Sequence, residues 1–132
     1  MLSKFGAEVI FCGPPDFAPD ISATLAPGVV VCHDLDAALL GADVVMSLRI
    51  QKERLAGKQI NLEDYIAKFQ VTPQRMKLAR PDAIVMHPGP IVRGLELANE
   101  VADGPQSVMH EQVANGVKTR IAILATVLKA AQ

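Results

Sequence analysis

Short apolar runs alternate along the chain with longer amphipathic segments. The apolar and partly β-branched runs 8–12, 29–32, 43–48 and 83–86 predict four strands. The last two runs are almost continuously apolar, which is typical of strands that helices cover on both faces. Strands that alternate with helices pair in parallel through right-handed crossovers. The pattern therefore predicts a parallel α/β domain.

Capping residues indicate where the connecting helices begin. A first helix is expected over 17–25, before the helix-stopping pair Pro27-Gly28. Three later polar residues can accept hydrogen bonds from the first turn of a helix. The helices expected after them are 35–40 following Asp34, 62–69 following Asn61 and 73–79 following Thr72.

The longest predicted helix covers 106–130. Apolar residues recur in it every three or four positions and form one stripe, which we expect to pack against the sheet. The stripe consists of Met109, Val113, Val117, Ile121, Leu124 and Leu128.

The first residues are unusual for a doubly wound domain, which normally opens with a strand. Residues 2–6 resemble the end of a helix with a glycine stop, placed directly before the first predicted strand. Either the terminus is simply ragged, or an earlier strand and most of its helix are missing. With 132 residues, the chain has the size of one domain.

Composition excludes several classes of function. The 13 basic and 14 acidic residues give a net charge of −1 and form no run of like charge, which argues against a nucleic-acid or anionic-membrane partner. No apolar stretch reaches the roughly 20 residues that span a bilayer. The first residues also lack the apolar core of a secretory signal.

The cysteines and motifs indicate no metal or cofactor. Cys12 and Cys32 each end an apolar run, and we interpret them as small buried residues rather than as a disulfide or metal pair. The sequence contains no zinc spacing, P-loop or Gly-x-Gly-x-x-Gly. A reducing cytoplasm is therefore the expected compartment.

Polar residues follow the third predicted strand, at the edge where parallel α/β sheets bind ligands. Alternation places Arg49 and Gln51 on one side of the chain and Ile50 and Lys52 on the other. Arginine can hold a carboxylate with two parallel hydrogen bonds, and glutamine offers both a donor and an acceptor. A solvated charged turn is the alternative interpretation.

The fourth predicted strand ends in His87-Pro88-Gly89-Pro90. Two prolines fix φ and glycine adopts conformations that other residues avoid, so the segment is expected to be rigid and to present backbone carbonyls. Such carbonyls can accept hydrogen bonds from an amide or ammonium group. For His87 itself, a structural hydrogen-bonding role is favoured over that of a catalytic base.

These two motifs, Leu48 to Arg54 and His87 to Pro90, together resemble the aspartate carbamoyltransferase family. The similarity continues through 93–97, 101–108 and 112–117, and covers nearly the whole chain. It implies a Rossmann-like, three-layer domain of about four strands that lacks its first strand. Ornithine carbamoyltransferases share the fold, but they have a Cys-containing motif in place of His-Pro-Gly-Pro.

The resemblance also implies a reaction, in which the α-amine of L-aspartate receives the carbamoyl group of carbamoyl phosphate during pyrimidine biosynthesis. No cofactor is implied, and the parent enzyme is expected to be a homotrimer or larger. The resemblance implies that the residues act as follows: Arg49 and Gln51 bind L-aspartate, His87, Pro88, Gly89 and Pro90 contact the carbamoyl group, and Lys52, Glu53 and Arg93 support the loop and the contacts between domains.

The chain departs from the family pattern in two respects. Val92 stands where related sequences often have asparagine. The Ser-x-Arg-Thr-Arg segment of the N-terminal carbamoyl phosphate-binding domain does not occur. Residues 1–132 are therefore expected to be one incomplete aspartate-binding domain, inactive alone, with no complete catalytic set. The alternative is a non-catalytic amino-acid-binding or regulatory module that pairs with another chain.

Overall fold

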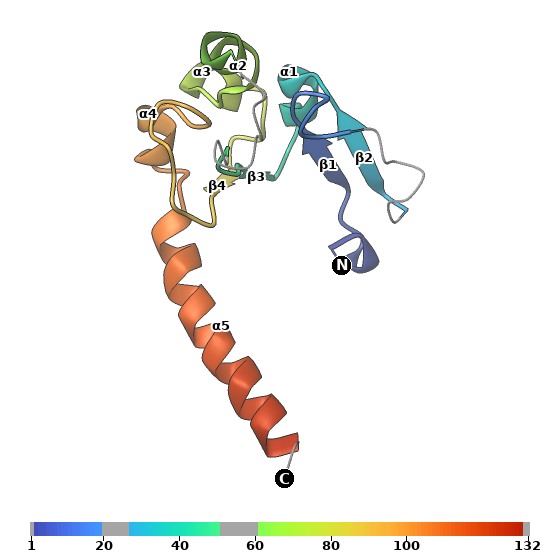
Figure 1. Cartoon of the computed structure of the whole chain (residues 1–132), viewed down its shortest axis with the longest axis vertical. Coiled ribbons are helices and arrows are strands. Elements are labelled where there is room, and N and C mark those ends of the chain that lie inside the picture. The colour runs from blue at the N-terminus through green and yellow to red at the C-terminus, as the bar shows by residue number, and fades with distance from the viewer. Residues whose placement is uncertain (1, 20–26, 51–60, 131–132) are drawn as a thin grey trace.

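The computed structural model describes residues 2–19, 27–50 and 61–130. Strands and helices alternate along these residues (Figure 1). In chain order, the elements are η1 Leu2–Phe5, β1 Val9–Cys12, β2 Val29–Cys32, α1 Leu35–Leu39, β3 Val44–Met46, α2 Leu62–Phe69, α3 Pro73–Met76, β4 Ile84–Met86, α4 Asn99–Ala102 and α5 Met109–Ala130.

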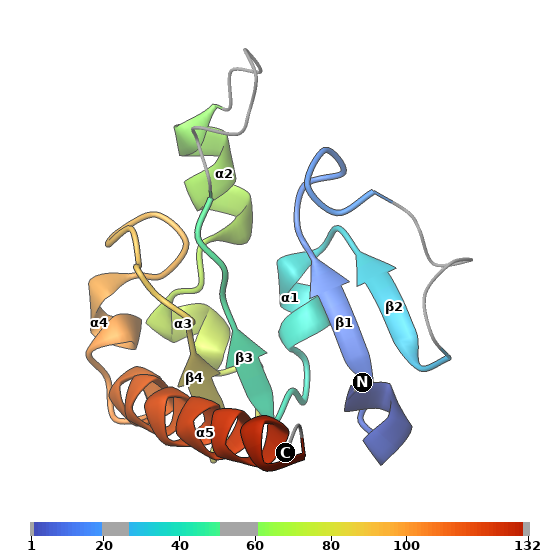
Figure 2. The ribbon, with the colours of Figure 1, turned by 60° about the horizontal axis from the view of Figure 1, so that its bottom comes forward.

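All the strand pairs are parallel, which confirms the predicted α/β class. β1 pairs with β2, with Val9 opposite Val29, and β3 pairs with β4, with Val44 opposite Ile84. The four strands lie where the apolar runs predict them, but they form two two-stranded sheets among the described residues instead of one continuous sheet. In both ribbon views the strands follow the order β4, β3, β1, β2 (Figures 1 and 2).

Three of the predicted helix caps are present in the structure. Asp34 accepts hydrogen bonds from the first turn of α1, Asn61 accepts one in α2, and Thr72 accepts one in α3. α3 ends at Met76, earlier than expected, and α4 lies in a segment for which no helix was predicted. Of the predicted helix over 17–25, Phe17 lies in a turn and residues 20–26 are outside the described part.

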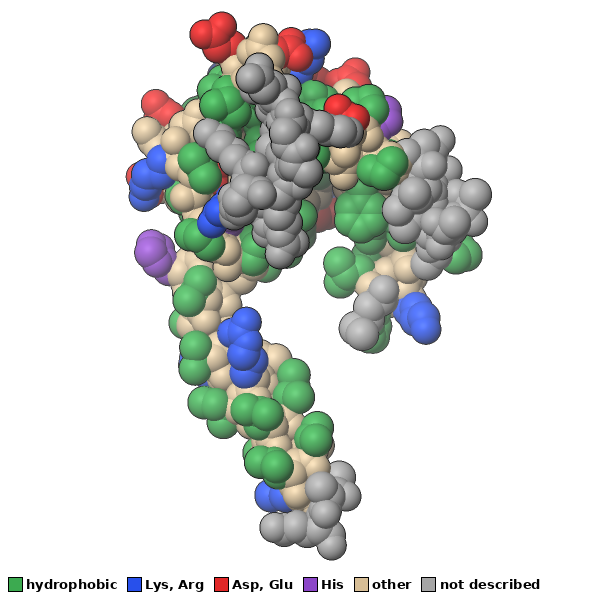
Figure 3. Space-filling model, in the orientation of Figure 1, with side chains coloured by type: hydrophobic (Ala, Val, Ile, Leu, Met, Phe, Trp, Pro, Cys, Tyr) green, Lys and Arg blue, Asp and Glu red, His purple; other side chains and the backbone are tan. Residues whose placement is uncertain are grey.

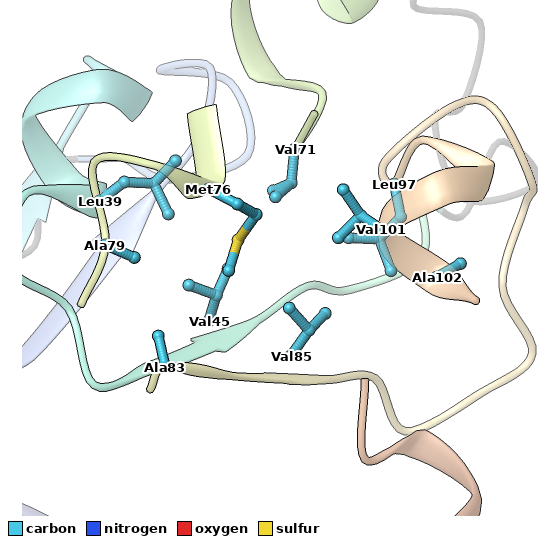
Figure 4. Packing of buried hydrophobic residues seen from close by; sticks show 10 residues of the cluster. All are labelled: Leu39, Val45, Val71, Met76, Ala79, Ala83, Val85, Leu97, Val101 and Ala102. Atoms are coloured by element: carbon cyan, nitrogen blue, oxygen red, sulfur yellow. The ribbon is translucent and has the colours of Figure 1, made fainter. Parts of the chain in front are cut away.

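The core lies between the β3–β4 sheet and the short helices α3 and α4. Val45 and Val85 point from the strands toward Met76 and Val101 (Figure 4). Val85 and Leu97 are fully buried. The remaining members of this cluster are Leu39, Val71, Ala79, Ala83 and Ala102.

The opposite face of this sheet is open, contrary to the expectation that helices cover both faces. Val44 is 49% exposed and Met46 is 51% exposed. α5 contacts β4, and the half-buried Met109 at the start of the helix packs against the core cluster. The rest of α5 projects away from the body of the molecule (Figure 1).

The apolar stripe of α5 therefore does not pack on the sheet, and that expectation was wrong. From Val113 onward its side chains are exposed, and the space-filling view shows a row of hydrophobic groups along the helix (Figure 3). Two features account for this: the helix leaves the sheet close to its start, since Val113 is already 57% exposed, and its 22 residues extend about 33 Å, far beyond three-residue strands. None of the described helices is long and apolar enough to cross a membrane.

Candidate functional site

The two motifs singled out in the sequence lie at neighbouring strand ends. Met46 is opposite Met86 in the parallel β3–β4 pair, and the Ser47 N–H donates to the Met86 carbonyl at 3.0 Å. Arg49 follows three residues after Met46, and Gly89 follows three after Met86. The register of one strand pair thus brings both motifs to the same sheet edge, which is where parallel α/β sheets bind ligands.

The arginine side of the site is only partly described. Arg49 is half-buried, and the adjacent Ile50 is buried. Gln51, Lys52 and Glu53 lie outside the described residues. Their expected roles therefore remain predictions.

The segment from His87 to Val92 forms a loop, which we call the carbonyl loop. Gly89 has φ of +71°, in the left-handed region that favours glycine, and the Gly89–Pro90 peptide bond is cis. Pro88, Gly89 and Pro90 are exposed, whereas His87 is 1% exposed. No hydrogen bond from another described residue reaches the carbonyls of these three exposed residues. The loop therefore exposes three residues whose carbonyls accept no hydrogen bond from the part of the chain that the structure describes.

The buried His87 side chain is part of the loop's internal structure. Its Nδ1 accepts a hydrogen bond from the Gly89 N–H at 2.9 Å, so in the neutral ring the proton is on Nε2. Nε2 lies 3.2 Å from Oε1 of Glu96, although the two groups are not aligned as a hydrogen bond. Both nitrogens face the protein interior, and Nδ1 is hydrogen-bonded there, which fits a structural role for this histidine.

Two residues with no predicted role complete this arrangement. Glu96, which is 1% exposed, accepts the Val92 N–H through Oε1 at 2.7 Å. Gln112, in the first turn of α5, accepts the His87 N–H at 2.9 Å. The sequence does contain a signal for Glu96, which lies between Leu95 and Leu97. An acidic residue in such an apolar run is rarely buried unless it has a partner, so its position suggests a buried polar contact. Nothing in the sequence distinguishes Gln112.

Arg93 pairs with an acidic residue on the far side of the loop. Its guanidinium donates two hydrogen bonds to Asp103, which follows α4, at 2.6 and 2.9 Å. These hydrogen bonds raise the pKa of Arg93 and lower the pKa of the Asp103 carboxyl. Arg93 therefore links the end of the carbonyl loop to α4, which is compatible with the loop-supporting role expected of it.

A second group of polar residues lies at the ends of β1 and β2. Cys12 and Cys32 are opposite each other in the strand pair, and both are free and half-buried. Burial raises the pKa of Cys12 to about 11, with smaller contributions from Cys32 and Asp34. His33 contacts the Gly13 carbonyl through Nδ1 at 2.8 Å. Within the described ranges, no group of three or more metal-binding side chains occurs.

Comparison with known proteins agrees with the strand-end motifs. Aspartate carbamoyltransferase catalytic subunits are similar in sequence. The one from Koribacter versatilis (strain Ellin345) is 61% identical over 128 residues, which are 97% of this chain and 42% of that protein. The one from Thermus thermophilus is 44% identical over 124 residues, which are 94% of this chain and 40% of that protein.

Solved structures give the same answer at the level of the fold. Ornithine carbamoyltransferase from Pyrococcus furiosus superimposes with a TM-score of 0.79 at 28% identity, over 93% of this chain and 42% of that one. Ornithine carbamoyltransferase from Thermus thermophilus superimposes with a TM-score of 0.77 at 29% identity, over 93% and 40%. The chain thus spans about two fifths of the length of these relatives.

The family model described as "Aspartate/ornithine carbamoyltransferase, Asp/Orn binding domain" matches residues 1–127. This match covers every described strand, the carbonyl loop and most of α5. The chain belongs to the aspartate/ornithine carbamoyltransferase family and corresponds to its Asp/Orn-binding domain.

Proposed function

We propose that residues 1–132 supply the L-aspartate-binding half of an aspartate carbamoyltransferase active site. The observation that carries the proposal is the position of Arg49 and the carbonyl loop at adjacent ends of the β3–β4 pair. The first provides a cation for a carboxylate, and the second provides acceptors for N–H groups. An amino acid that carries both a carboxylate and an amine needs these two kinds of group side by side.

Each residue then has a defined task. Arg49 holds a carboxylate of L-aspartate through its guanidinium, and Gln51 adds a donor and an acceptor beside it. The carbonyls of Pro88, Gly89 and Pro90 accept hydrogen bonds from the carbamoyl amide and the incoming amine. Catalysis by such a site consists mostly of positioning two substrates and stabilising developing charge.

The carbamoyl phosphate site belongs, in this proposal, to a second domain that corresponds to the remaining length of the relatives. The order of the strands supports a further element. In a common doubly wound order, 3-2-1-4-5, the first strand lies between the second and the fourth. If β1 to β4 are the second to fifth strands, that place lies between β1 and β3, whose facing edges pair with no strand in the described residues. A strand from outside 1–132 would join both sheets.

The assembly follows from the same proposal. The complete enzyme acts in the cytoplasm as a homotrimer or larger, and binds carbamoyl phosphate together with L-aspartate. Residues 1–132 alone bind aspartate but do not turn it over. Lys52 and Glu53 support closure of the loop in the complete enzyme.

Calorimetric titration of the chain tests the binding half of the proposal. L-aspartate and the unreactive dicarboxylate succinate are expected to bind, and Arg49→Ala is expected to weaken both by tenfold or more, because a charge-assisted bidentate contact is lost. Arg80→Ala is the matched control, since Arg80 is exposed and pairs with Asp43 and Asp82 elsewhere on the surface. Equal affinity in Arg49→Ala and wild type would contradict the assignment.

Complementation tests the catalytic half. The chain is mixed with a separately produced carbamoyl phosphate-binding domain from a relative, and formation of N-carbamoyl-L-aspartate is measured. Turnover is expected only in the mixture. Turnover by the chain alone would contradict the division of the site, and aspartate binding without turnover in a stable mixed complex would favour the non-catalytic module.

A further inference from the structure

One oxygen atom of a buried side chain joins the two ends of the carbonyl loop. Oε1 of Glu96 accepts the Val92 N–H at 2.7 Å, after the cis peptide bond, and lies 3.2 Å from His87 Nε2, before it. The other nitrogen of the same histidine accepts the Gly89 N–H, in the middle of the loop. Glu96 thus holds the end of the loop by a hydrogen bond, and its oxygen lies against the histidine ring that holds the centre of the loop.

These contacts use the backbone N–H groups of the loop inside the protein. Pro88 and Pro90 have no N–H group, and the N–H groups of Gly89 and Val92 are engaged inside the protein. The N–H of His87 is engaged by Gln112. The carbonyls of the exposed residues are left as acceptors, because the internal contacts use donors and not acceptors.

The burial of Glu96 and His87 needs an explanation. The Glu96 and His87 side chains are each nine-tenths or more buried, and two of their polar atoms, Oε2 of Glu96 and Nε2 of His87, have no hydrogen-bond partner in the described structure. An acidic side chain placed in an apolar interior without full compensation destabilises the fold. An apolar residue of similar volume would remove that cost but could not accept the Val92 N–H. Burying Glu96 therefore lowers the stability of the fold. We attribute its presence to the hydrogen bond that it accepts from the loop.

We propose that Glu96 is a positioning residue for the carbamoyl transfer reaction, which sets the carbonyls of Pro88, Gly89 and Pro90 because one carboxyl oxygen accepts the Val92 N–H and lies against the His87 ring. This inference rests on the proposed function, because it takes the loop carbonyls to be the acceptors of the substrate N–H groups. Glu96 itself does not touch substrate. Its effect is on the geometry of the acceptors, so it alters the chemical step more than the binding of aspartate.

Three substitutions at Glu96 separate the effect of side-chain length from the effect of its negative charge. Glu96→Gln keeps the length of the side chain and an acceptor oxygen but carries no charge. Glu96→Asp keeps the carboxyl group but shortens the side chain by one methylene, so that one oxygen cannot serve both His87 and Val92. Glu96→Ala removes the acceptor altogether. Positioning by reach predicts that Gln substitutes for Glu and that Asp and Ala do not.

The first measurement is amide hydrogen exchange by NMR in the isolated chain, which needs no substrate. Exchange at Val92 and Gly89 is expected to become at least tenfold faster in Glu96→Asp and Glu96→Ala, and to stay within about threefold of wild type in Glu96→Gln. The Val85 amide, which donates to the Gln106 carbonyl in the core, is the internal reference for a folded domain. Unchanged exchange at Val92 and Gly89 in folded Glu96→Asp overturns the proposal.

The second measurement is the steady-state rate of the complemented enzyme. In Glu96→Asp, kcat is expected to fall tenfold or more while the KM for aspartate changes by less than about threefold, and Glu96→Gln is expected to restore kcat. Rescue by Asp and not by Gln would show that charge matters and would overturn the proposal. If wild type neither binds aspartate nor turns over while the exchange result holds, the proposed function fails and the attachment of the loop stands. If Glu96→Ala does not fold, the Gln and Asp variants decide the matter.

Discussion

Both oxygens of the Asp103 carboxyl accept hydrogen bonds from Arg93, at 2.6 and 2.9 Å. The pair joins the residue after the carbonyl loop to the residue after α4, and both side chains are exposed. The hydrogen bonds from Arg93 hold the pKa of Asp103 below its usual range.

The stability of the protein at acid pH is expected to depend on the Arg93–Asp103 pair. A carboxyl group whose pKa is lower in the folded state contributes stability above its unfolded pKa of about 3.9, and loses it as the pH falls through the folded value. Wild type should therefore lose slightly more stability than Asp103→Asn between about pH 5 and pH 2.5, measured by urea unfolding at each pH. The difference should shrink in 1 M NaCl, because exposed charges are screened. Parallel acid profiles for the two proteins would contradict this prediction.

Among the Arg and Lys side chains that the structure describes, Arg75 is expected to contribute most to stability. Its guanidinium donates to Asp36 in α1 at 2.8 Å, and to the carbonyls of Gln70 and Ala67 at 2.9 Å each, so it connects three helices. Its side chain is only 20% exposed. A single hydrogen bond to a charged group contributes about 1.5–3 kcal/mol. Because Asp36 is exposed and water can replace part of the lost contacts, Arg75→Ala should lower the free energy of unfolding by about 2 kcal/mol in total.

Two matched variants sharpen the Arg75 test. Arg75→Lys keeps the charge but cannot reach three acceptors, so it should recover less than half of the loss. Arg80→Ala removes an exposed cation with two acidic neighbours and should cost less than about 0.5 kcal/mol. Equal losses in Arg75→Ala and Arg80→Ala, measured by denaturant unfolding, would show that the helix connection is unimportant.

Leucines in the body and in α5 are expected to respond differently to truncation. Leu97 is fully buried, and Leu97→Ala should cost about 2–5 kcal/mol because it leaves a cavity. Leu124 is 61% exposed, and Leu124→Ala should change stability by less than about 0.5 kcal/mol. Thermal unfolding of both variants, at low protein concentration to avoid association, makes the comparison. A loss above about 2 kcal/mol in Leu124→Ala would mean that a surface packs on α5 in the isolated chain.

Cys12 is expected to react slowly with alkylating agents. Because burial raises its pKa to about 11, the reactive thiolate at pH 8 is a very small fraction of the population. In a Cys32→Ser variant, iodoacetamide should label Cys12 roughly a hundredfold more slowly than a free cysteine of ordinary pKa, about 8.5. The same variant in denaturant is the control and should react at the ordinary rate. Rapid labelling of the folded variant would show that the strand end opens.

Local sequence signals predict the strands and the helix starts well. The apolar runs that end in Cys12, Cys32 and Met86 are strands with nearly the expected bounds, because β-branched residues favour extended backbone wherever they are covered. The caps at Asp34, Asn61 and Thr72 act within one helical turn, so neighbouring sequence determines them. The strand-end positions of Arg49 and Gly89 follow from the same local order.

Tertiary features are less accessible from sequence. The position of the α5 stripe depends on which surface is available, and periodicity shows only that one face is apolar, not what covers it. The role of Glu96 depends on the folded path of the loop, which brings the backbone of Val92 and the ring of His87 to one oxygen. The role of Gln112 depends on where α5 begins relative to β4, which is a matter of packing.

The projecting helix α5 also has a mechanical consequence. It is a rod of about 33 Å whose first turn packs against the core through Met109, whereas Val113 and the later apolar residues of its stripe are exposed. A tilt of about 10° about that contact moves the far tip by about 6 Å and moves Gln112, three residues from the contact, by less than about 1 Å. Gln112 accepts the His87 N–H at 2.9 Å, and a hydrogen bond of this length weakens with displacements of that size. A tilt of the helix would therefore displace its far tip by several ångströms and the hydrogen bond beside the carbonyl loop by only a fraction of that distance.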